Sequence, residues 1–373
     1  MAGVSDTPDL NTEGMPKLSF DGKTLSHFEF WSGPKFYWPI WLYFIYLSIR
    51  FRGLTLITAA NPSFPFGGLV GESKSKILGI ARDSLPDLIP DFIVFDRLEE
   101  DKYQAAERAL NISKRQSIKF PFVMKPDLGC RGAGVQKICN QDELVEYLDK
   151  FPANGKIIIQ ELADDEGEAG IFYARNPQDE SGQVISVTLK YFPYVYGDGI
   201  RTLRTLISED PRASQLPQIY LKRFSNKLDS VPLEGQKIRL AFAGNHSKGT
   251  IFRNGNALIT KKLDYAFDEV AKKIPGFYFG RIDIRFSDLQ RVLSGERDFK
   301  IIEINGAGSE ATHIWDSRTT LSQAWHDVRC QFRLAWEIGA INRSLGHQPN
   351  TLLEIYRAWQ TEKKLAKNYP PTL

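Results

Sequence analysis

Cysteine is scarce in this sequence, and that scarcity excludes several kinds of protein. The chain contains three cysteines, Cys130, Cys139 and Cys330, with no paired spacing and no metal-ligand spacing. Sparse cysteines of this kind are typical of reduced thiols, so we expect no disulfide framework. The first residues, 1–18, also lack the basic start and apolar stretch of a signal peptide. The sequence therefore predicts a cytoplasmic protein.

A strong excess of charge of one sign is missing too. The chain carries 48 Lys and Arg against 45 Asp and Glu, and it has no basic run. Proteins that bind nucleic-acid backbones usually carry a dense basic patch, so we expect no nucleic-acid partner. The content of 42% hydrophobic and 25% charged residues is that of a soluble globular protein with a sizeable core.

No hydrophobic run is long enough for a transmembrane helix, which needs roughly 20 apolar residues. The longest candidate, 36–49, is nearly all apolar or aromatic and is flanked by Lys35, Arg50 and Arg52. Two interpretations stay open for it. It is either a helix buried in an N-terminal domain or a helix that lies in a membrane interface, anchored by its Trp, Tyr and Arg residues.

The chain divides into three parts by its pattern of expected elements. Residues 1–72 hold the aromatic helix and a β-like run at 54–58. Residues 73–312 alternate between strand and helix patterns, which predicts an α+β fold with a nucleotide-binding lobe at about 115–165 and a catalytic lobe at about 166–312. Residues 313–373 have helical periodicity.

Two strand-like segments in the second lobe carry candidate metal ligands. Side chains alternate between the faces of a strand, so Asp283 in 280–285 and both Glu303 and Asn305 in 299–305 each lie on a polar face. If the two strands pair, these three side chains converge. Two carboxylates and an amide oxygen suit Mg²⁺, which takes few protein ligands and shares the rest with phosphates and water. The alternative for each strand is a solvated polar face.

The same alternation predicts which side chains face the core. Ile282 and Ile284 should face away from Asp283, and Ile302 and Ile304 away from Glu303.

A glycine-rich loop follows the expected strand that ends at Lys125. Glycines at 129, 132 and 134 allow backbone N–H groups to wrap a phosphate, and a lysine neutralises its charge. The spacing is not that of a Walker A loop, and a simple turn explains the glycines equally well. The next strand, 156–161, ends where backbone groups can meet an adenine edge, although it is otherwise an ordinary strand end.

The order of these motifs resembles the ATP-grasp superfamily, most closely its D-alanine–D-alanine ligase or carboxylate–amine ligase branch. The resemblance covers about residues 73–312. The motifs that carry it are 75–78, 122–126 with the glycine loop, 159–162, 280–283 and 302–305. Residues 195–203 resemble a Gly-Asp-Gly motif of cyanophycin-synthetase-like ligases. The resemblance implies an ATP-grasp fold, two α+β lobes that grip ATP, here with a divergent N-terminal domain and C-terminal helices.

This resemblance implies a nucleotide site built from strand ends and the glycine loop. The residues it assigns are Lys76, Lys125 and Lys190 to the phosphates, Gly129, Arg131, Gly132 and Gly134 to the loop that covers them, Gln160, Glu161 and Leu162 to the adenine hinge, and Glu168 to the ribose.

It also implies a mechanism in which a carboxylate attacks the γ-phosphate of ATP and an amine then displaces phosphate from the acyl-phosphate. Asp283, Glu303 and Asn305 hold one or two Mg²⁺ ions, with Mn²⁺ as the alternative ion. Arg281 stabilises the developing oxyanion, helped by backbone N–H groups up to Gly308. The implied partners are therefore a small-molecule carboxylate and an amine.

Several alternatives remain at this stage. One is an enzyme of the same fold with a thiol or phosphoryl acceptor, and another is a non-catalytic, membrane-peripheral nucleotide-binding scaffold. The N-terminal substrate motif of D-alanine–D-alanine ligases is not recognisable, so segments 61–68 and 71–74 are either part of a substrate pocket or a domain-joining turn. Segment 245–249 and the side chains of 309, 310 and 313 are acceptor-side candidates, with a hairpin turn and a helix cap as the alternatives.

Overall fold

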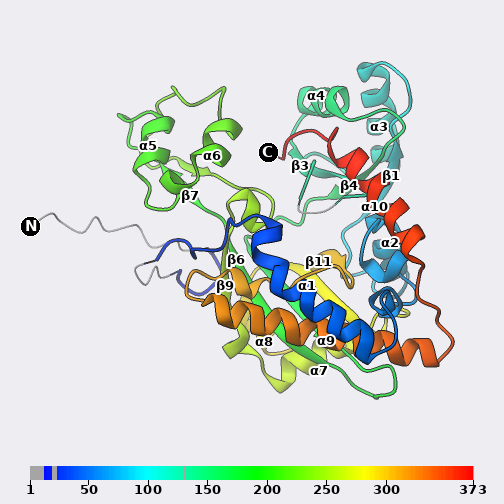
Figure 1. Ribbon diagram of the computed structural model, residues 1–373. Coiled ribbons are helices and arrows are strands. Elements are labelled where there is room, and N and C mark those ends of the chain that lie inside the picture. Colours follow the sequence, from blue (N-terminus) through cyan, green and yellow to red (C-terminus); the bar gives the residue numbers. More distant parts are fainter. Residues whose placement is uncertain (1–11, 19–22, 130–131, 373) are drawn as a thin grey trace, which may run out of the picture.

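The computed structural model describes residues 12–18, 23–129 and 132–372, and it confirms the α+β class (Figure 1). Two antiparallel sheets with helices packed on them form two lobes, and residues of both lobes line one cavity between them. None of the helices in the described part of the chain is both long and apolar enough to cross a bilayer.

The first lobe is a sheet of four strands in the order β1-β4-β2-β3, with all neighbours antiparallel. Its elements are β1 (Phe92–Asp96), α3 (Lys102–Arg115), β2 (Phe122–Pro126), β3 (Gln136–Ile138), α4 (Gln141–Lys150) and β4 (Lys156–Glu161). The side chain of Asn140 caps α4 by accepting from the N–H of Glu143. The core of the lobe lies between this sheet and the helices α3 and α4.

The second lobe is a sheet of five strands in the order β11-β10-β5-β6-β9. Its elements are β5 (Gly167–Ala174), β6 (Gln183–Tyr191), β9 (Ile251–Asn254), α7 (Lys261–Lys272), β10 (Phe279–Phe286), α8 (Leu289–Leu293) and β11 (Phe299–Asn305). Every residue of β5 is buried, because α7 covers one face of the sheet and a layer of other helices covers the opposite face. The expected pairing of the two candidate metal strands, β10 and β11, is confirmed.

The helix α1 (Gly33–Arg50) lies beside α9 (Leu321–Ser344), and the two run in the same direction (Figure 1). The indole N–H of Trp325 donates to the carbonyl of Phe36 at 3.0 Å near one end of the pair. The indole of Trp336 donates to Gly53 at 3.2 Å near the other end. The helices α1 and α9 therefore form one layer against the second sheet.

Only one face of α1 is buried. Phe36, Ile40 and Leu47 belong to the core that α1 shares with α9 and the sheet. Of the two interpretations left open for this helix, burial describes this face, whereas the opposite face is exposed. The β-like run at 54–58 is not a strand, because a 3-10 helix spans Leu56–Ala59.

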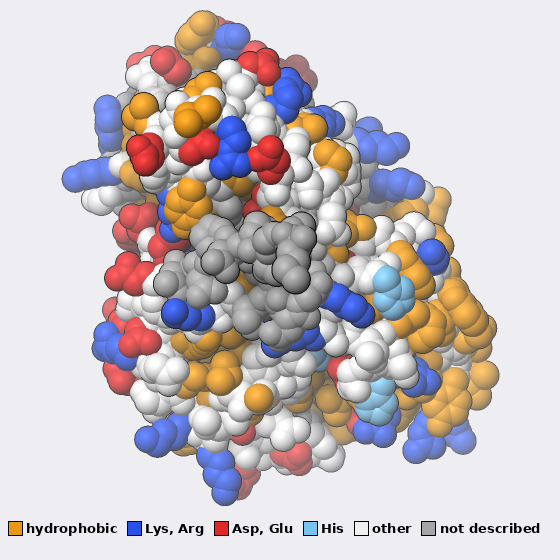
Figure 2. All heavy atoms as spheres, turned by 90° about the vertical axis from the view of Figure 1, so that its left-hand side faces the viewer, with side chains coloured by type: hydrophobic (Ala, Val, Ile, Leu, Met, Phe, Trp, Pro, Cys, Tyr) orange, Lys and Arg blue, Asp and Glu red, His pale blue; other side chains and the backbone are white. Residues whose placement is uncertain are grey.

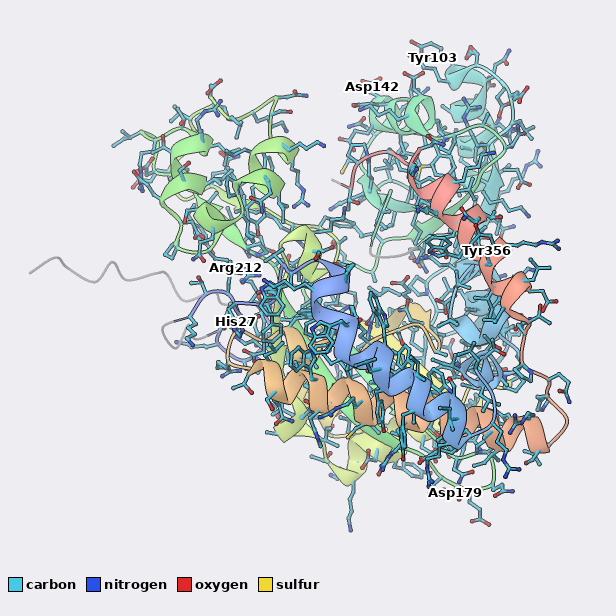
Figure 3. All side chains as sticks on the ribbon, viewed as in Figure 1. His27, Tyr103, Asp142, Asp179, Arg212 and Tyr356 are labelled. Carbon is cyan, nitrogen blue, oxygen red and sulfur yellow. The ribbon has the colours of Figure 1, made fainter. Side chains whose placement is uncertain are left out.

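A small subdomain projects from the second lobe, at the upper left of Figure 1. It contains β7 (Tyr194–Tyr196), α5 (Leu203–Glu209), α6 (Pro217–Arg223) and β8 (Lys237–Arg239), with a core of its own. A buried ion pair of 2.8 Å between Arg212 and Glu29 ties it to the segment before α1. Figure 3 shows Arg212 and His27 near each other at this junction.

The remaining elements lie between and beside these parts. They are α2 (Lys74–Ser84), α10 (Leu352–Ala366) and 3-10 turns at Pro65–Gly68, Ala213–Gln215, His246–Lys248, Asn256–Leu258 and Thr312–Trp315. After α10, the chain returns to the first lobe, where the hydroxyl of Tyr369 donates to the carbonyl of Leu128 and that of Thr372 to Gly132. The C-terminal tail thus holds the glycine-rich loop from outside.

Candidate active site

The candidate site is the cavity between the two sheets, where the ends of β2, β4, β10 and β11 meet. Its lining includes nearly every position that the sequence singles out: Lys125, Gly129, Gly132, Gln160, Glu161, Leu162, Glu168, Lys190, Arg281, Asp283, Glu303 and Asn305. Arg131 lies outside the described residues. Residues from segments far apart in the chain therefore converge on one place, as the motif order leads us to expect.

The register of β10 and β11 brings the candidate metal ligands together. Asp283 lies opposite Glu303, and Arg281 opposite Asn305. The side-chain amide of Asn305 donates to Asp283 at 3.3 Å. These three oxygen-bearing side chains thus form the cluster that strand alternation predicts.

The prediction that Ile302 faces the core is wrong. The register shifts after Asp283, so that Asp283 pairs with Glu303 while Ile284 pairs with Ile301. Ile302 is the extra residue of this bulge, and it lines the cavity, whereas Ile301 and Ile304 enter the core. A bulge next to a site re-aims side chains in this way.

Asp283 is buried and is held by two cations. The guanidinium of Arg281 donates to its two oxygens at 2.8 and 3.1 Å, and the ammonium of Lys190 lies 3.0 Å from one of them. Burial alone raises the pKa of a carboxyl group, but Arg281 and Lys190 outweigh this effect and hold the pKa of Asp283 below its ordinary value. The carboxylate is therefore ionised at neutral pH.

Glu168 lies beside this group and shares its lysine. Lys190 donates to one of its oxygens at 3.0 Å, and Arg285 to the other at 2.8 Å. Burial raises the pKa of Glu168, but Lys190 and Arg285 more than offset it, so the pKa is lowered. Each carboxylate oxygen of Glu168 thus binds one cation. The residue also lines the cavity, where the resemblance implies a contact with the ribose.

Lys125 reaches from the first lobe to the second. Its ammonium donates to the side-chain oxygen of Gln160 at 2.8 Å and to the carbonyl of Ile302 at 2.9 Å. Burial lowers its pKa to about 8. The amide nitrogen of Gln160 is buried and has no hydrogen-bond partner. A buried donor without a partner is costly, so this atom fits a ligand that brings an acceptor to the hinge.

The first predicted lysine is placed differently from the expectation. Lys76 is exposed and does not line the cavity, whereas Lys74 does. The two lie on opposite sides of α2, because two residues turn a helix by about 200°. The ammonium of Lys74 bonds to the carbonyl of Gly129 and lies 3.8 Å from Glu303. The predicted segment therefore reaches the cavity through Lys74 and not through Lys76.

The glycines of the loop have different roles. Gly129, with φ of 144°, and Gly132, with φ of 69°, line the cavity in conformations that side chains disfavour. Gly134 does not line it. A Cβ at Gly134 would lie 2.8 Å from Pro126, and its carbonyl accepts from the hydroxyl of Tyr147. Gly134 therefore shapes the loop rather than facing a ligand.

Gly308, the predicted backbone contribution to an oxyanion site, lines a second cavity, but its N–H group is already bonded within the chain. The N–H of Gly308 donates to Gly68 at 2.7 Å, and the N–H of Ala307 to Gly67 at 3.0 Å. The N–H of Gly306 donates to the carboxyl group of Glu72 at 2.8 Å. These donors join the turn after β11 to the chain before α2, so they do not point into the cavity.

Glu72 is a site residue that the motifs did not single out. It lines the cavity near Lys74 and Glu303, and burial raises its pKa to about 8. One feature of the sequence pointed to Glu72: segment 71–74 was a candidate for part of a substrate pocket. The structure places both Glu72 and Lys74 of that segment in the cavity.

A second cavity of about 680 Å³ adjoins the first. Arg281, Asn305 and Lys190 line both cavities, so the candidate metal strands stand at their junction. The walls of the second cavity include seven aromatic side chains: Phe30, Trp31, Phe36, Tyr37, Phe252, Trp315 and Trp359. Two further predicted substrate contacts, Ser309 and Glu310, also line it.

Glu310 is the notable acid of the second cavity, since burial raises its pKa to about 7. His313 was predicted beside it but faces elsewhere. Its ring is buried between Ser186, at 2.7 Å, and Asp327, at 3.0 Å. Asn245 and His246, from the segment predicted as an acceptor-side loop, do line this cavity, and the ring of His246 stacks on Trp315.

The donor set at the junction fits a magnesium ion bound together with phosphates. Among the described residues, no three His, Cys, Asp or Glu side chains lie together as metal ligands. The cluster instead offers two carboxylates, Asp283 and Glu303, and the amide of Asn305. Mg²⁺ typically uses one or two carboxylates and completes its shell with waters and substrate phosphates, and lysines 74, 125 and 190 surround the place where phosphates would lie.

No protein-family model and no curated protein sequence matches the chain. Among solved structures, it is similar to a bifunctional glutathione synthetase from Pasteurella multocida, with 16% identity and a TM-score of 0.34 over 70% of this chain and 38% of that one. The VanG D-Ala:D-Ser ligase from Enterococcus faecalis matches with 13% identity and a TM-score of 0.38, over 72% and 61% of the two chains. The D-alanine–D-alanine ligase from Bacillus anthracis matches with 14% identity and a TM-score of 0.35, over 70% and 68%.

The chain thus spans less than two thirds of the length of the first two of these structures. A D-alanine–D-alanine ligase is thus among the structures to which the chain is similar.

Proposed function

We propose that the protein is an ATP-dependent ligase that joins a carboxylate to an amine through an acyl-phosphate. The observation that carries this proposal is the junction of the two cavities. Arg281 and Asn305 face both, next to Asp283. A nucleotide cavity and an organic-substrate cavity that meet at a metal-binding cluster suit a phosphoryl transfer between the two.

ATP would occupy the first cavity. Gln160 would meet the adenine with its unpartnered amide nitrogen, and the loop at Gly129 and Gly132 would lie over the phosphates. Lys74, Lys125 and Lys190 would neutralise phosphate charge. The protein then contributes positioning and charge rather than a nucleophile, which is the usual way of catalysing phosphoryl transfer.

Asp283, Glu303 and Asn305 would hold one or two Mg²⁺ ions, which when bound supply charge neutralisation between the β- and γ-phosphates. Arg281 holds Asp283 in its ionised form and presents its guanidinium at the junction. It is therefore placed to stabilise charge on an acyl-phosphate oxygen. With the N–H of Gly308 already bonded, Arg281 would act there without the backbone donors first expected.

The organic substrates would lie in the second cavity. An oxygen of the carboxylate attacks the γ-phosphorus and ADP leaves. The amine nitrogen then attacks the acyl carbon, inorganic phosphate leaves, and the nitrogen loses a proton. Glu310 lines this cavity with a pKa raised by burial to about 7, which suits a group that accepts that proton near neutral pH.

A product screen tests the proposal. Purified protein is incubated with Mg-ATP and pools of amino acids, small peptides and polyamines, and nucleotides and new masses are followed by mass spectrometry. We expect ADP, phosphate and a product whose mass is the sum of two substrates less one water. AMP would indicate adenylation, and a thioester would indicate a thiol acceptor; either would contradict the proposal. The Asp283→Asn variant is the control for contaminating activity.

A further inference from the structure

Helix α1 carries a second apolar face that the fold leaves uncovered. Its large exposed apolar side chains share a spacing of three and four residues: Trp38, Trp41, Leu42, Ile45, Tyr46 and Ile49. This spacing places all of them on one side of the helix, opposite the face that packs on α9. We call this set the α1 outer face. Ile49 is 74% exposed, and Trp38 is 55% exposed.

The chemistry of this surface is specific. A contiguous apolar surface that stays in water is uncommon in a soluble protein and usually marks a binding surface. The α1 outer face mixes two tryptophans and a tyrosine with aliphatic side chains. Trp and Tyr favour the headgroup level of a bilayer, where one end of the ring is apolar and the other is wet.

Positive charge surrounds the α1 outer face. The sequence has no Asp or Glu between Glu29 and Glu72, but it has Lys35, Arg50 and Arg52 there. All three cations are exposed. The charge at this surface therefore complements an anionic partner.

The neighbouring helix α9 adds to this charge. Arg329 and Arg333 are exposed residues of α9, the helix that packs beside α1. Arg333 also has an acidic neighbour, since it lies 3.7 Å from Glu337. Arg329 lies one turn from Arg333 on the same exposed side of α9.

The position of α1 on the outside of the molecule allows its outer face to contact a flat surface. In Figure 1, α1 lies at the front of the molecule with α9 behind it. In Figure 2, a band of hydrophobic side chains bordered by Lys and Arg follows the right-hand edge, which is the front of Figure 1 seen in profile. A second copy of the chain on this face would bring like charges together, which disfavours self-association.

We propose that the α1 outer face docks the protein on a membrane surface with anionic headgroups, with α1 lying in the plane of that surface. The packed face of α1 stays on α9, so only the outer side chains enter the interface. The flanking cations then meet the negative surface potential. Because Phe36 and Tyr37 of the same helix line the second cavity, docking brings that cavity close to the bilayer.

Vesicle co-sedimentation of the full chain tests this inference. The probes are phosphatidylcholine vesicles with and without phosphatidylserine. We expect the wild-type protein to sediment with the anionic vesicles and to be released by high salt. A variant with Trp38→Gln, Trp41→Gln, Ile45→Gln and Ile49→Gln should stay in the supernatant. Gln keeps helix propensity, so the variant should retain its melting temperature.

Two further variants make the test specific. Ile200→Gln with Leu233→Gln removes apolar side chains that are at least as exposed from the small subdomain, and this variant should bind vesicles like the wild type. Arg50→Gln with Arg329→Gln should lower partitioning to anionic vesicles by about thirtyfold. A wild-type protein that ignores anionic vesicles, or a folded α1 variant that still binds them, overturns the inference. So does a wild-type oligomer that the α1 variant abolishes without any vesicle binding.

Discussion

The ammonium group of Lys190 lies 3.0 Å from a carboxylate oxygen of Asp283, and both side chains are buried. Lys190 comes from β6 and Asp283 from β10, with β5 between the two strands. Glu168 of β5 binds the same ammonium group at 3.0 Å. The sheet therefore fixes a charged row at the junction of the two cavities. A phosphate bound beside Asp283 would share Lys190 with it.

Lys74 and Lys76 make a matched pair for testing the nucleotide site. Lys74 lines the cavity, whereas Lys76 is exposed on the other side of α2. Lys74→Ala should weaken the binding of Mg-ATP by about tenfold, because it removes a charge-assisted contact. Lys76→Ala should leave it unchanged. Isothermal titration calorimetry measures both, and equal effects from the two substitutions would argue against this placement of the phosphates.

Glu303 tests the metal assignment. Its substitution Glu303→Gln keeps the shape of the side chain but removes one of the two carboxylates of the cluster. We expect wild-type protein to bind ATP more tightly with Mg²⁺ than with EDTA, and the variant to lose at least about tenfold of that difference. The readout is binding of a fluorescent ATP analogue, titrated with and without the ion. A variant with the full magnesium effect would contradict the assignment.

Gly68 joins the turn after β11 to the chain before α2. It has a φ of +75°, and a Cβ there would lie 2.6 Å from the Cα of Gly306. Gly68→Ala should therefore lower the free energy of unfolding by about 2 kcal/mol or more. Gly79→Ala is the control, since Gly79 lies in α2 with no atom near its Cβ position. It should stabilise the protein by about 0.5–1 kcal/mol. Urea denaturation distinguishes the two.

Glu310 predicts a pH dependence of stability. Burial raises its pKa from 4.5 to about 7, so the folded state binds more protons than the unfolded state between these values. The stability that the protonated group contributes is fully present below pH 4.5 and is lost as the pH rises through about 7. Relative to Glu310→Gln, the wild type should thus lose about 3 kcal/mol across this window. If the free energy of unfolding of the two proteins depended on pH in the same way, the raised pKa of Glu310 would be contradicted.

The sequence predicts the core of the site because strand alternation and strand order are local properties. The pairing of Asp283 with Glu303 follows once β10 and β11 are adjacent. The bulge that turns Ile302 into the cavity is not visible in the alternation, because it depends on how the two strands fit each other. Glu303 still lies opposite Asp283, as predicted, because the extra residue, Ile302, comes before it in the strand.

Other features depend on contacts between distant segments. The rotation of α2, which turns Lys74 inward instead of Lys76, is set by packing and not by the motif. The N–H of Gly308 looked available in the sequence, but it is bonded to Gly68, far away in the chain. The run at 54–58 has β-branched residues, yet it forms a 3-10 helix against α9. Tertiary contacts decide each of these cases.

The most direct test of the central claim follows one oxygen atom. The carboxylate substrate found in the product screen is labelled with ¹⁸O in its carboxyl group and incubated with the protein, Mg-ATP and the amine. An acyl-phosphate formed at the junction transfers one labelled oxygen to the released phosphate, and mass spectrometry should show singly labelled phosphate with unlabelled ADP. Unlabelled phosphate, or label in AMP, would show that the carboxylate does not attack the γ-phosphorus and would contradict the account.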